Sequence, residues 1–109
     1  MSIQVESILR PSAGAIGSEE FLTLLETEAV KVQRIVSNEA KSPEKFWYEQ
    51  SYTEWVLLVR GHAVLAFEGG ERLELNEGDY LAIPPHARHR IDETGPETIW
   101  LVVHLTGGA

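Results

Sequence analysis

Hydrophobic and polar residues alternate over short distances along most of the chain, and turn-forming residues interrupt them regularly. From residue 29 onward, segments rich in β-branched and aromatic residues recur at 30–36, 46–52, 55–59, 63–67, 80–83 and 97–105. Such segments are typical of β-strands. Short strands separated by turns about every eight to twelve residues indicate an all-β sandwich or barrel. We therefore predict an all-β fold from residue 29 to the end.

The turns between these segments are marked by glycine and proline. Gly61 separates two apolar runs, and the Gly69-Gly70 pair is typical of a hairpin turn. Residues 76–79 form a further polar turn. Pro84 and Pro85 cannot donate to a strand ladder, so we expect them at a strand end or at the rim of a barrel.

The first 28 residues follow a different pattern. Residues 11–17 indicate a loop, and Ser18 can cap a helix whose first turn holds Glu19 and Glu20. Four apolar residues then follow at a spacing that a helix allows: Phe21, Leu22, Leu24 and Leu25. We predict an N-terminal segment, residues 1–28, with a short helix packed on a β-barrel formed by residues 29–109.

Composition and charge narrow the possible partners. The 109 residues suffice for one domain with a single core. A formal net charge of −8 disfavours nucleic acid or an anionic membrane as partner. The absence of cysteine excludes disulfides and thiolate chemistry. No apolar run approaches the length of a membrane span, and the first residues lack signal-peptide features, so we expect a cytoplasmic protein.

Side chains able to carry chemistry concentrate in two segments, 47–54 and 86–89, with His104 further on. Carboxylate oxygen and neutral imidazole nitrogen are ligands that Mn(II), Fe(II), Zn(II) and Ni(II) accept. A carboxylate beside a positioned histidine can also act in general acid–base catalysis. Both segments lie at the ends of predicted strands, where a barrel opens to solvent.

At these residues the chain resembles the cupin superfamily, specifically the small single-domain cupins. Glu54 and Gly61, with six residues between them, match the end of the family's first motif. Gly78, Pro84 and His89 match the spacing of the second motif. The resemblance covers roughly residues 29–105. It implies a double-sheet β-barrel with a pocket opening between the sheets, and commonly a homodimer.

The chain departs from the first motif at its two metal-binding histidines. With one motif spacing these positions fall on Trp47 and Glu49, and with the other on Tyr48 and Gln50. Neither choice supplies a histidine. In the second motif, His86 stands where the family has glycine.

Carried over position by position, the resemblance implies Glu54 and His89 as metal ligands, with Glu49 as a third by substitution. Such a ligand set suits Mn(II) or Fe(II) better than Cu(II), with Zn(II) and Ni(II) also acceptable. Each residue has an alternative role. Glu54 can instead be buried in a structural ion pair with Arg60, Arg88 or Arg90, and Glu49 can point to solvent.

The remaining candidates surround these ligands. His86 is either a catalytic acid or base or a surface residue on a rim loop. Arg88 can attract an anionic group on a ligand. Trp47, Tyr48 and Gln50 are expected to line the pocket, whereas His104 is either a pocket residue or a structural histidine beside the core.

Three functional hypotheses follow. The first is a small-molecule-binding cupin that holds a divalent metal, in which case metal-assisted chemistry on a small polar substrate is implied by the resemblance. The second is a metal-free binding, sensing or accessory module, which the missing histidines favour. The third is a barrel whose main role is assembly with a second copy.

Overall fold

The computed structural model describes residues 1–107, and every regular element found there is a β-strand. The eight strands are β1 (Glu19–Glu26), β2 (Val30–Ser37), β3 (Thr53–Arg60), β4 (His62–Phe67), β5 (Arg72–Asn76), β6 (Tyr80–Ile83), β7 (His89–Thr94) and β8 (Thr98–Leu105). The predicted all-β fold is therefore confirmed.

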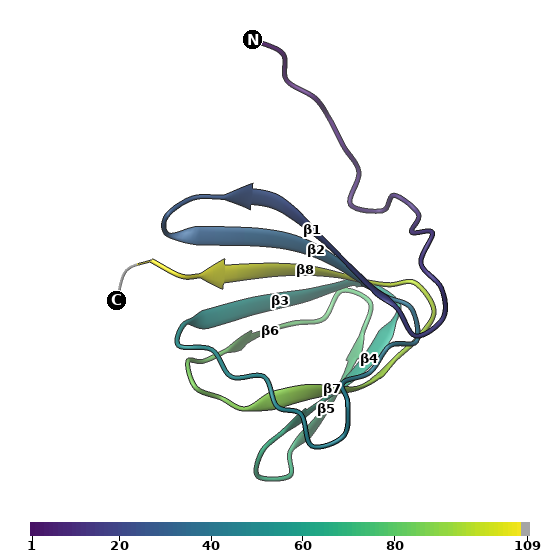
Figure 1. The fold of residues 1–109 in the computed structure, drawn as a ribbon, viewed down its shortest axis with the longest axis vertical. Helices are drawn as coiled ribbons and strands as arrows, with labels where there is room; N and C mark the ends of the chain where they lie inside the picture. The colour runs from purple at the N-terminus through teal and green to yellow at the C-terminus, as the bar shows by residue number, and fades with distance from the viewer. Residues whose placement is uncertain (108–109) are drawn as a thin grey trace.

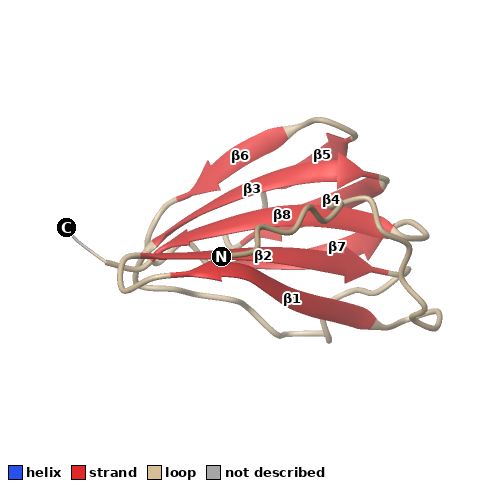
Figure 2. Cartoon of the chain, turned by 90° about the horizontal axis from the view of Figure 1, so that it is seen from above, coloured by secondary structure: helices blue, strands red, loops and turns tan. Residues whose placement is uncertain are grey.

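The strands form two antiparallel sheets that face each other (Figure 1 and Figure 2). The larger sheet has five strands in the order β1-β2-β8-β3-β6, and the smaller has three in the order β5-β4-β7. Strands distant in sequence therefore become neighbours. β8, the last strand, lies between β2 and β3 and pairs with both along its length.

The core lies between the two sheets. On β3, Val56 and Leu58 point inward, and on β8 Trp100 and Val102 do the same. Burying one such side chain contributes about 1.5–3 kcal/mol. The buried cluster comprises Val56, Leu58, Ala63, Leu65, Leu75, Ile83, Trp100 and Val102.

Gly61 joins the two sheets at the turn between β3 and β4. Its backbone has a φ of 101°, a conformation that other residues rarely adopt. A β-carbon at this position would lie 2.9 Å from the α-carbon of Thr98. The turn therefore requires glycine for both conformation and space. The predicted hairpin turn at Gly69-Gly70 is likewise present between β4 and β5.

The predicted N-terminal helix is wrong. The segment is strand β1, which pairs with β2 from Glu19 opposite Ser37 to Glu26 opposite Lys31. An irregularity at Leu24 shifts the register within this pairing, so the apolar spacing of the segment fits a bulged strand as well as a helix. Pairing with β2 decided between the two, and the sequence of the segment alone does not contain that information.

The segment 46–52, predicted as a strand, is also different in the structure. It is an irregular connection with one isolated bridge, between Tyr48 and His89. Two backbone hydrogen bonds hold this bridge: the amide of Tyr48 donates to the carbonyl of His89 at 2.7 Å, and the reverse bond is 3.0 Å. The connection is therefore fixed against β7 without joining a sheet.

Arg34 fastens the N-terminal segment to the outer side of the larger sheet. This side chain is only 2% exposed. Its Nε donates to the carbonyl of Ile8 at 2.9 Å, and a second guanidinium nitrogen donates to the carbonyl of Arg10. The expected boundary between residues 28 and 29 falls in the turn joining β1 to β2, so both predicted parts contribute to one sheet. In residues 1–107 no helix is long and apolar enough to span a membrane.

Candidate functional site

A pocket of about 160 Å³ opens between the two sheets. A cavity of this size accommodates a molecule about as large as benzene. Most of its wall is apolar, and its polar side chains come from five separate parts of the chain. The residues that line it are Glu19, Phe21, Gln33, Ile35, Tyr48, Gln50, Glu54, Val56, Leu65, Ile83, His89, Ile91, Trp100, Val102 and His104.

Glu54 and His104 form the central polar pair of this pocket. They are directly opposite each other in the pairing of β3 with β8, so both side chains leave the same face of the sheet. Glu54 Oε2 lies 3.6 Å from His104 Nδ1, and each side chain is 12% exposed. This separation is too long for a hydrogen bond between the two atoms.

Gln33 on β2 determines which nitrogen of His104 carries the hydrogen. His104 Nε2 lies 3.1 Å from the amide oxygen of Gln33, which can only accept. The hydrogen is therefore on Nε2, and Nδ1 has a lone pair in the neutral ring. That Nδ1 is the single buried side-chain nitrogen or oxygen without a hydrogen-bond partner among residues 1–107. A buried nitrogen without a hydrogen-bond partner lowers the stability of the fold unless a ligand or a water molecule donates a hydrogen bond to it.

Burial favours the uncharged forms of both groups. It raises the pKa of Glu54 above its ordinary value of 4.5 and lowers the pKa of His104 below 6.5. The charge of Lys31, directly opposite His104 on β2, lowers the pKa of His104 further. An ion pair would shift both values the other way. The directions of both shifts therefore differ from those of an ion pair, and burial favours a carboxyl group facing a neutral imidazole.

His89 supplies a second imidazole to the pocket. Its Nδ1 lies 2.9 Å from the carbonyl oxygen of Ala87, so Nδ1 carries the hydrogen and Nε2 has the lone pair. The ring lies between those of Tyr48 and Phe67, with centroids 5.8 and 5.9 Å away. Burial lowers the pKa of His89, although the bond to Ala87 opposes this effect. The ring is thus oriented and favoured in its neutral form.

Tyr52 lies beside the pair, outside the set of lining residues. Its ring meets that of His104 edge to face, with centroids 5.5 Å apart. Burial raises the pKa of Tyr52, and the negative charge that Glu54 carries when ionised adds to the effect. Tyr52 therefore restricts the orientation of the His104 ring.

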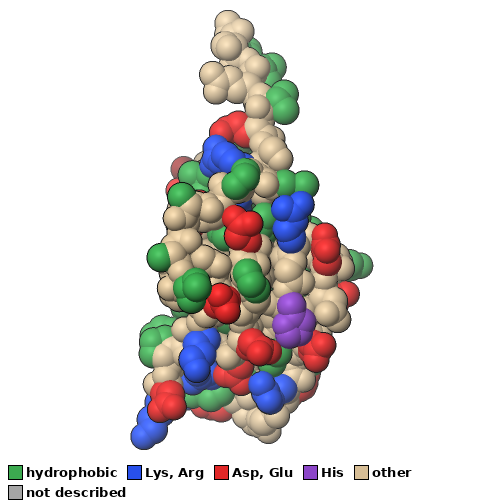
Figure 3. Space-filling view, turned by 90° about the vertical axis from the view of Figure 1, so that its right-hand side faces the viewer, with side chains coloured by type: hydrophobic (Ala, Val, Ile, Leu, Met, Phe, Trp, Pro, Cys, Tyr) green, Lys and Arg blue, Asp and Glu red, His purple; other side chains and the backbone are tan. Residues whose placement is uncertain are grey.

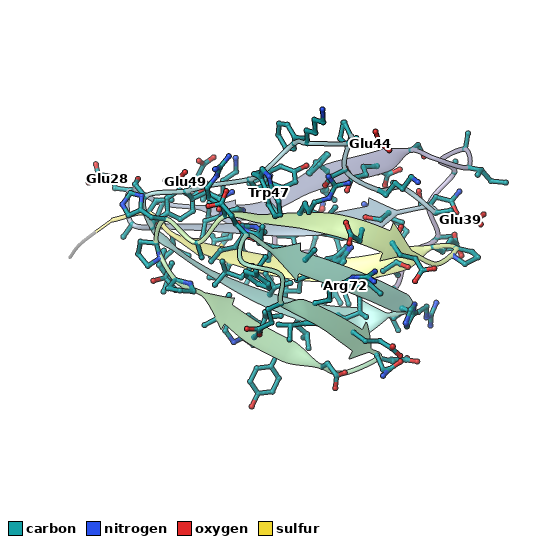
Figure 4. All side chains as sticks on the ribbon, turned by 90° about the horizontal axis from the view of Figure 1, so that it is seen from below. Glu28, Glu39, Glu44, Trp47, Glu49 and Arg72 are labelled. Carbon is teal, nitrogen blue, oxygen red and sulfur yellow. The ribbon has the colours of Figure 1, made fainter. Side chains whose placement is uncertain are left out.

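Five of the residues predicted for the site line this pocket: Tyr48, Gln50, Glu54, His89 and His104. The other four, Trp47, Glu49, His86 and Arg88, do not. Glu49 Oε2 instead lies 3.2 Å from His86 Nδ1, and Glu49 Oε1 lies 3.8 Å from Arg88 Nε. Trp47 and Glu49 lie near each other on the connection that precedes β3 (Figure 4). From this connection, Gln50 and Tyr48 therefore face the pocket, and Glu49 does not.

The predicted metal ligands do not converge. Glu54 and His89 share the pocket, but the third, Glu49, is engaged with His86 outside it. In residues 1–107, no three His, Asp or Glu side chains come together as a group that could hold a metal ion. A divalent metal needs several ligands in a defined geometry. The residues as placed do not fit such a centre.

Among the lining residues that the sequence analysis missed are Glu19, Phe21 and Gln33. Glu19 and Phe21 were assigned to a helix, and Gln33 lies within a segment assigned only as a β-branched strand. Gln33 and Ile35 are two residues apart on β2, so both side chains point to the same face of the strand. This spacing is the sequence signal that places Gln33 in the pocket. For β1 no local signal was available, because its direction depends on pairing with β2.

A two-sheet barrel of this topology, with its pocket between the sheets, is the architecture that the motif spacing implied. The cupin domain family matches residues 32–104, and the chain belongs to this family. A protein of Ralstonia eutropha JMP134, described as a candidate mannose-6-phosphate isomerase, is similar at 35% identity. That similarity covers 95% of this chain and 99% of the other, with a TM-score of 0.84.

More distant structures share the fold. A cupin superfamily protein of Desulfitobacterium hafniense DCB-2 is 18% identical, with 88% and 84% of the two chains covered and a TM-score of 0.75. An RmlC-like cupin of Methanocaldococcus jannaschii is also 18% identical, with 94% and 92% covered and a TM-score of 0.70. No curated protein matches this chain significantly.

Proposed function

We propose that this chain is a small-molecule-binding cupin whose ligand bonds to Glu54, His89 and His104 without a metal. The observation that carries the proposal is the unpartnered Nδ1 of His104, buried 3.6 Å from the Glu54 carboxyl group. A ligand hydroxyl near both atoms would donate to Nδ1 and accept the hydrogen of the protonated carboxyl group. One ligand hydroxyl would thereby form hydrogen bonds with both His104 Nδ1 and the Glu54 carboxyl group.

The rest of the pocket restricts the class of ligand. No Lys or Arg is among the lining residues, so a phosphate or carboxylate placed inside would lack a cation. The apolar wall, which includes Val56, Ile91 and Trp100, favours a compact hydrocarbon body. We therefore infer a small ligand, about as large as a six-membered ring, with one or two hydroxyl or carbonyl groups.

A ligand-observed NMR screen of small hydroxy and carbonyl compounds tests this proposal. We expect saturation transfer to at least one compound class, with binding weakened about tenfold or more in His104→Leu, since a buried hydrogen bond is lost. Glu49→Gln is the matched control because its carboxylate lies outside the pocket. Absence of binding across the screen, or equal binding by His104→Leu, would refute the proposal.

Metal binding through Glu49, Glu54 and His89 stays a prediction that the same protein can test. Elemental analysis of protein purified without chelator, followed by addition of Mn(II), Fe(II), Zn(II) and Ni(II), would give the stoichiometry. The metal-free proposal expects less than a tenth of an equivalent and no rise in melting temperature. One equivalent, lost in both Glu54→Ala and His89→Ala, would replace it with the metal-binding function.

A second candidate function is catalysis of an aldose–ketose isomerisation. Two observations favour it: the likeness to the candidate mannose-6-phosphate isomerase, and a carboxyl group beside two neutral imidazoles. A lone pair on His89 or His104 can remove the hydrogen next to a carbonyl, and Glu54 can protonate the carbonyl oxygen. The hydrogen then returns to the former carbonyl carbon, and the other hydroxyl of the enediol gives its proton to the Glu54 carboxylate, so the new carbonyl forms without an oxidant.

The absence of cations from the pocket means that a sugar phosphate would keep its phosphate outside. NMR of mannose and of mannose 6-phosphate in D₂O with the protein tests this function. Isomerisation would convert each substrate and place deuterium on the carbon that receives the hydrogen. If both sugars stay unchanged while the hydroxy-compound screen gives binding, the chain is a binding protein and not this isomerase.

A further inference from the structure

The pocket has a second polar end, formed by Glu19 on β1. Glu19 lies directly opposite Ser37 on β2, so both side chains leave the same face of the sheet. The hydroxyl of Ser37 donates to Glu19 Oε2 at 3.1 Å, and the indole nitrogen of Trp100 donates to the Ser37 hydroxyl at the same distance. Ser37 and Trp100 are both buried, whereas Glu19 is exposed. Side chains of the core therefore orient a carboxylate that solvent can reach.

The two polar ends of the pocket lie well apart along β2. Ser37 contacts Glu19 at one end, and Gln33 contacts His104 at the other. Ser37 and Gln33 are four residues apart in the sequence, which corresponds to about 13 Å along a strand. Ile35 lies between them on the same face and lines the pocket. The pocket is therefore elongated, with an apolar middle and a polar group at each end.

The Glu19 carboxylate has no positively charged partner within residues 1–107. None of the ion pairs formed by the Lys, Arg and His side chains of this part of the chain includes Glu19. An anionic ligand group at this end of the pocket would meet a like charge. A cationic group would instead meet a carboxylate whose charge is not yet compensated. This end of the pocket therefore favours a positively charged group.

Aromatic rings accompany this carboxylate. Phe21 is two residues from Glu19 on β1, so it points to the same face, where it lines the pocket and is 57% exposed. Tyr48 lines the pocket from the connection before β3. Burial raises the pKa of Tyr48, and the charge of Glu19 raises it further, so the carboxylate lies near the phenol ring. Because aromatic faces attract ammonium groups, these rings and Glu19 favour the same kind of ligand group.

The charge of the whole chain also favours a cationic ligand. The formal net charge is −8, and Figure 3 shows acidic side chains at many places on one face, with Lys and Arg among them. An acidic protein raises the concentration of cations near its surface and lowers that of anions. A cationic ligand is therefore attracted to the protein before it enters the pocket.

We propose that the ligand of this pocket is an extended organic amine with a hydroxyl group at its other end. Its ammonium group pairs with Glu19 beside Phe21 and Tyr48, and its hydroxyl group bonds to His104. This inference rests on the proposed function, since it takes the His104 end of the pocket as the hydroxyl site. It adds the charge and the shape of the ligand. A chain of about six carbon atoms keeps the ligand near the size of benzene and passes through the apolar middle.

Titration of the full chain with 6-amino-1-hexanol and with 1,6-hexanediol, followed by ligand-observed NMR, tests the proposal. Both compounds carry a hydroxyl group at one end, and they differ in whether the other end is an ammonium or a second hydroxyl group. We expect the amine to bind about fivefold or more tightly than the diol at low salt. This preference should shrink at about 1 M salt, because salt screens the attraction to an exposed carboxylate.

Substitutions on β1 locate the ammonium group. Glu19→Gln should bind the amine and the diol equally. Glu20→Gln is the matched control, because it changes the net charge equally but lies on the opposite face of β1, 3.5 Å from Arg34. It should keep the preference for the amine. Glu19→Lys should reverse the preference and bind 6-hydroxyhexanoate more tightly than 6-amino-1-hexanol. Folding should tolerate both Glu19 variants, since the side chain is exposed.

The same titrations separate this proposal from the proposed function. Equal binding of the amine and the diol by the wild type, or a preference that survives Glu19→Gln, would overturn the amine proposal. If the diol then binds the wild type but not His104→Leu, the hydroxyl site of the proposed function stands without it. If neither compound binds the wild type, the amine proposal is wrong whatever the screen of hydroxy and carbonyl compounds shows.

Discussion

Glu54 and His104 occupy directly opposed positions on β3 and β8, yet their facing atoms are 3.6 Å apart and share no hydrogen bond. The pairing of the two strands fixes this arrangement, because both side chains must point to the same side of the sheet. Burial favours the uncharged form of both groups, and Nδ1 of His104, which has no hydrogen-bond partner, can accept a hydrogen bond from a third group.

Glu54→Gln should change how stability depends on pH. Because the pKa of Glu54 is raised on folding, the folded state holds its proton more tightly than the unfolded state does. The destabilisation caused by ionising buried Glu54 is absent below the ordinary pKa of 4.5. It is fully present above the pKa that Glu54 has in the folded state. We expect Glu54→Gln to gain stability relative to wild type as pH rises from 4 to 8, because only the wild type must ionise a buried carboxyl group.

Urea unfolding of both proteins at several pH values measures that difference. Taking the difference removes the contribution of the surface carboxylates, which the two proteins share. Glu49→Gln, an exposed carboxylate changed in the same way, is the control and should show no comparable gain. A difference that stays constant with pH would mean that folding does not raise the pKa of Glu54.

His89 and His104 should titrate below the ordinary pKa of 6.5, since burial lowers the pKa of both rings. A lowered folded pKa means that the unfolded chain binds more protons, so each ring destabilises the fold as pH falls through 6.5. Ligand binding that needs their lone pairs should weaken over the same range. NMR of the ring carbons against pH measures each value directly. A pKa of His104 above 6.5 would instead indicate an ion pair with an ionised Glu54.

The backbone conformation at position 86 should favour glycine over histidine. Its backbone has a φ of 67°, in the left-handed region that glycine favours. Its side chain bonds to Glu49 at the surface, where such pairs contribute little. We expect His86→Gly to be more stable than His86→Ala by about 1 kcal/mol, because alanine keeps the conformational cost.

Denaturant unfolding of the wild type and both variants, under identical conditions, gives these values. Glu49→Gln serves as the reference for loss of the side-chain contact alone, since it keeps His86 in place. If His86→Ala equals or exceeds His86→Gly in stability, the backbone at this position is not a source of strain.

The parts of the fold that the sequence predicted are those set by local pattern. The consecutive β-branched and apolar positions of β3 and β8 identify them as strands wherever they pair. Gly61 identifies a turn because its conformation is local. The β1 segment was misassigned because its apolar spacing suits either a helix or a bulged strand, and the choice depends on β2.

The site was predicted in the same partial way. Glu54 and His89 were found because motif spacing fixes their positions along the chain. Whether Glu49 or Gln50 faces the pocket could not be known, since a shift of one residue exchanges their directions. The role of Gln33 depends on its hydrogen bond with His104 on the adjacent strand β8. The two residues are far apart in the sequence, so the sequence alone does not reveal this contact.

Arg34 should be required for both stability and the position of the N-terminal segment. Its guanidinium group is buried and donates to the carbonyls of Ile8 and Arg10, a geometry that the single ammonium group of lysine cannot reproduce. Arg34→Lys leaves carbonyls unpaired, and we expect a loss of about 1–3 kcal/mol. Limited proteolysis should then cut residues 1–17 faster than in wild type, while the barrel stays intact. The neighbouring Lys31→Arg, which leaves this contact alone, is the control. Equal cleavage of Arg34→Lys and wild type would show that other contacts hold the segment in place.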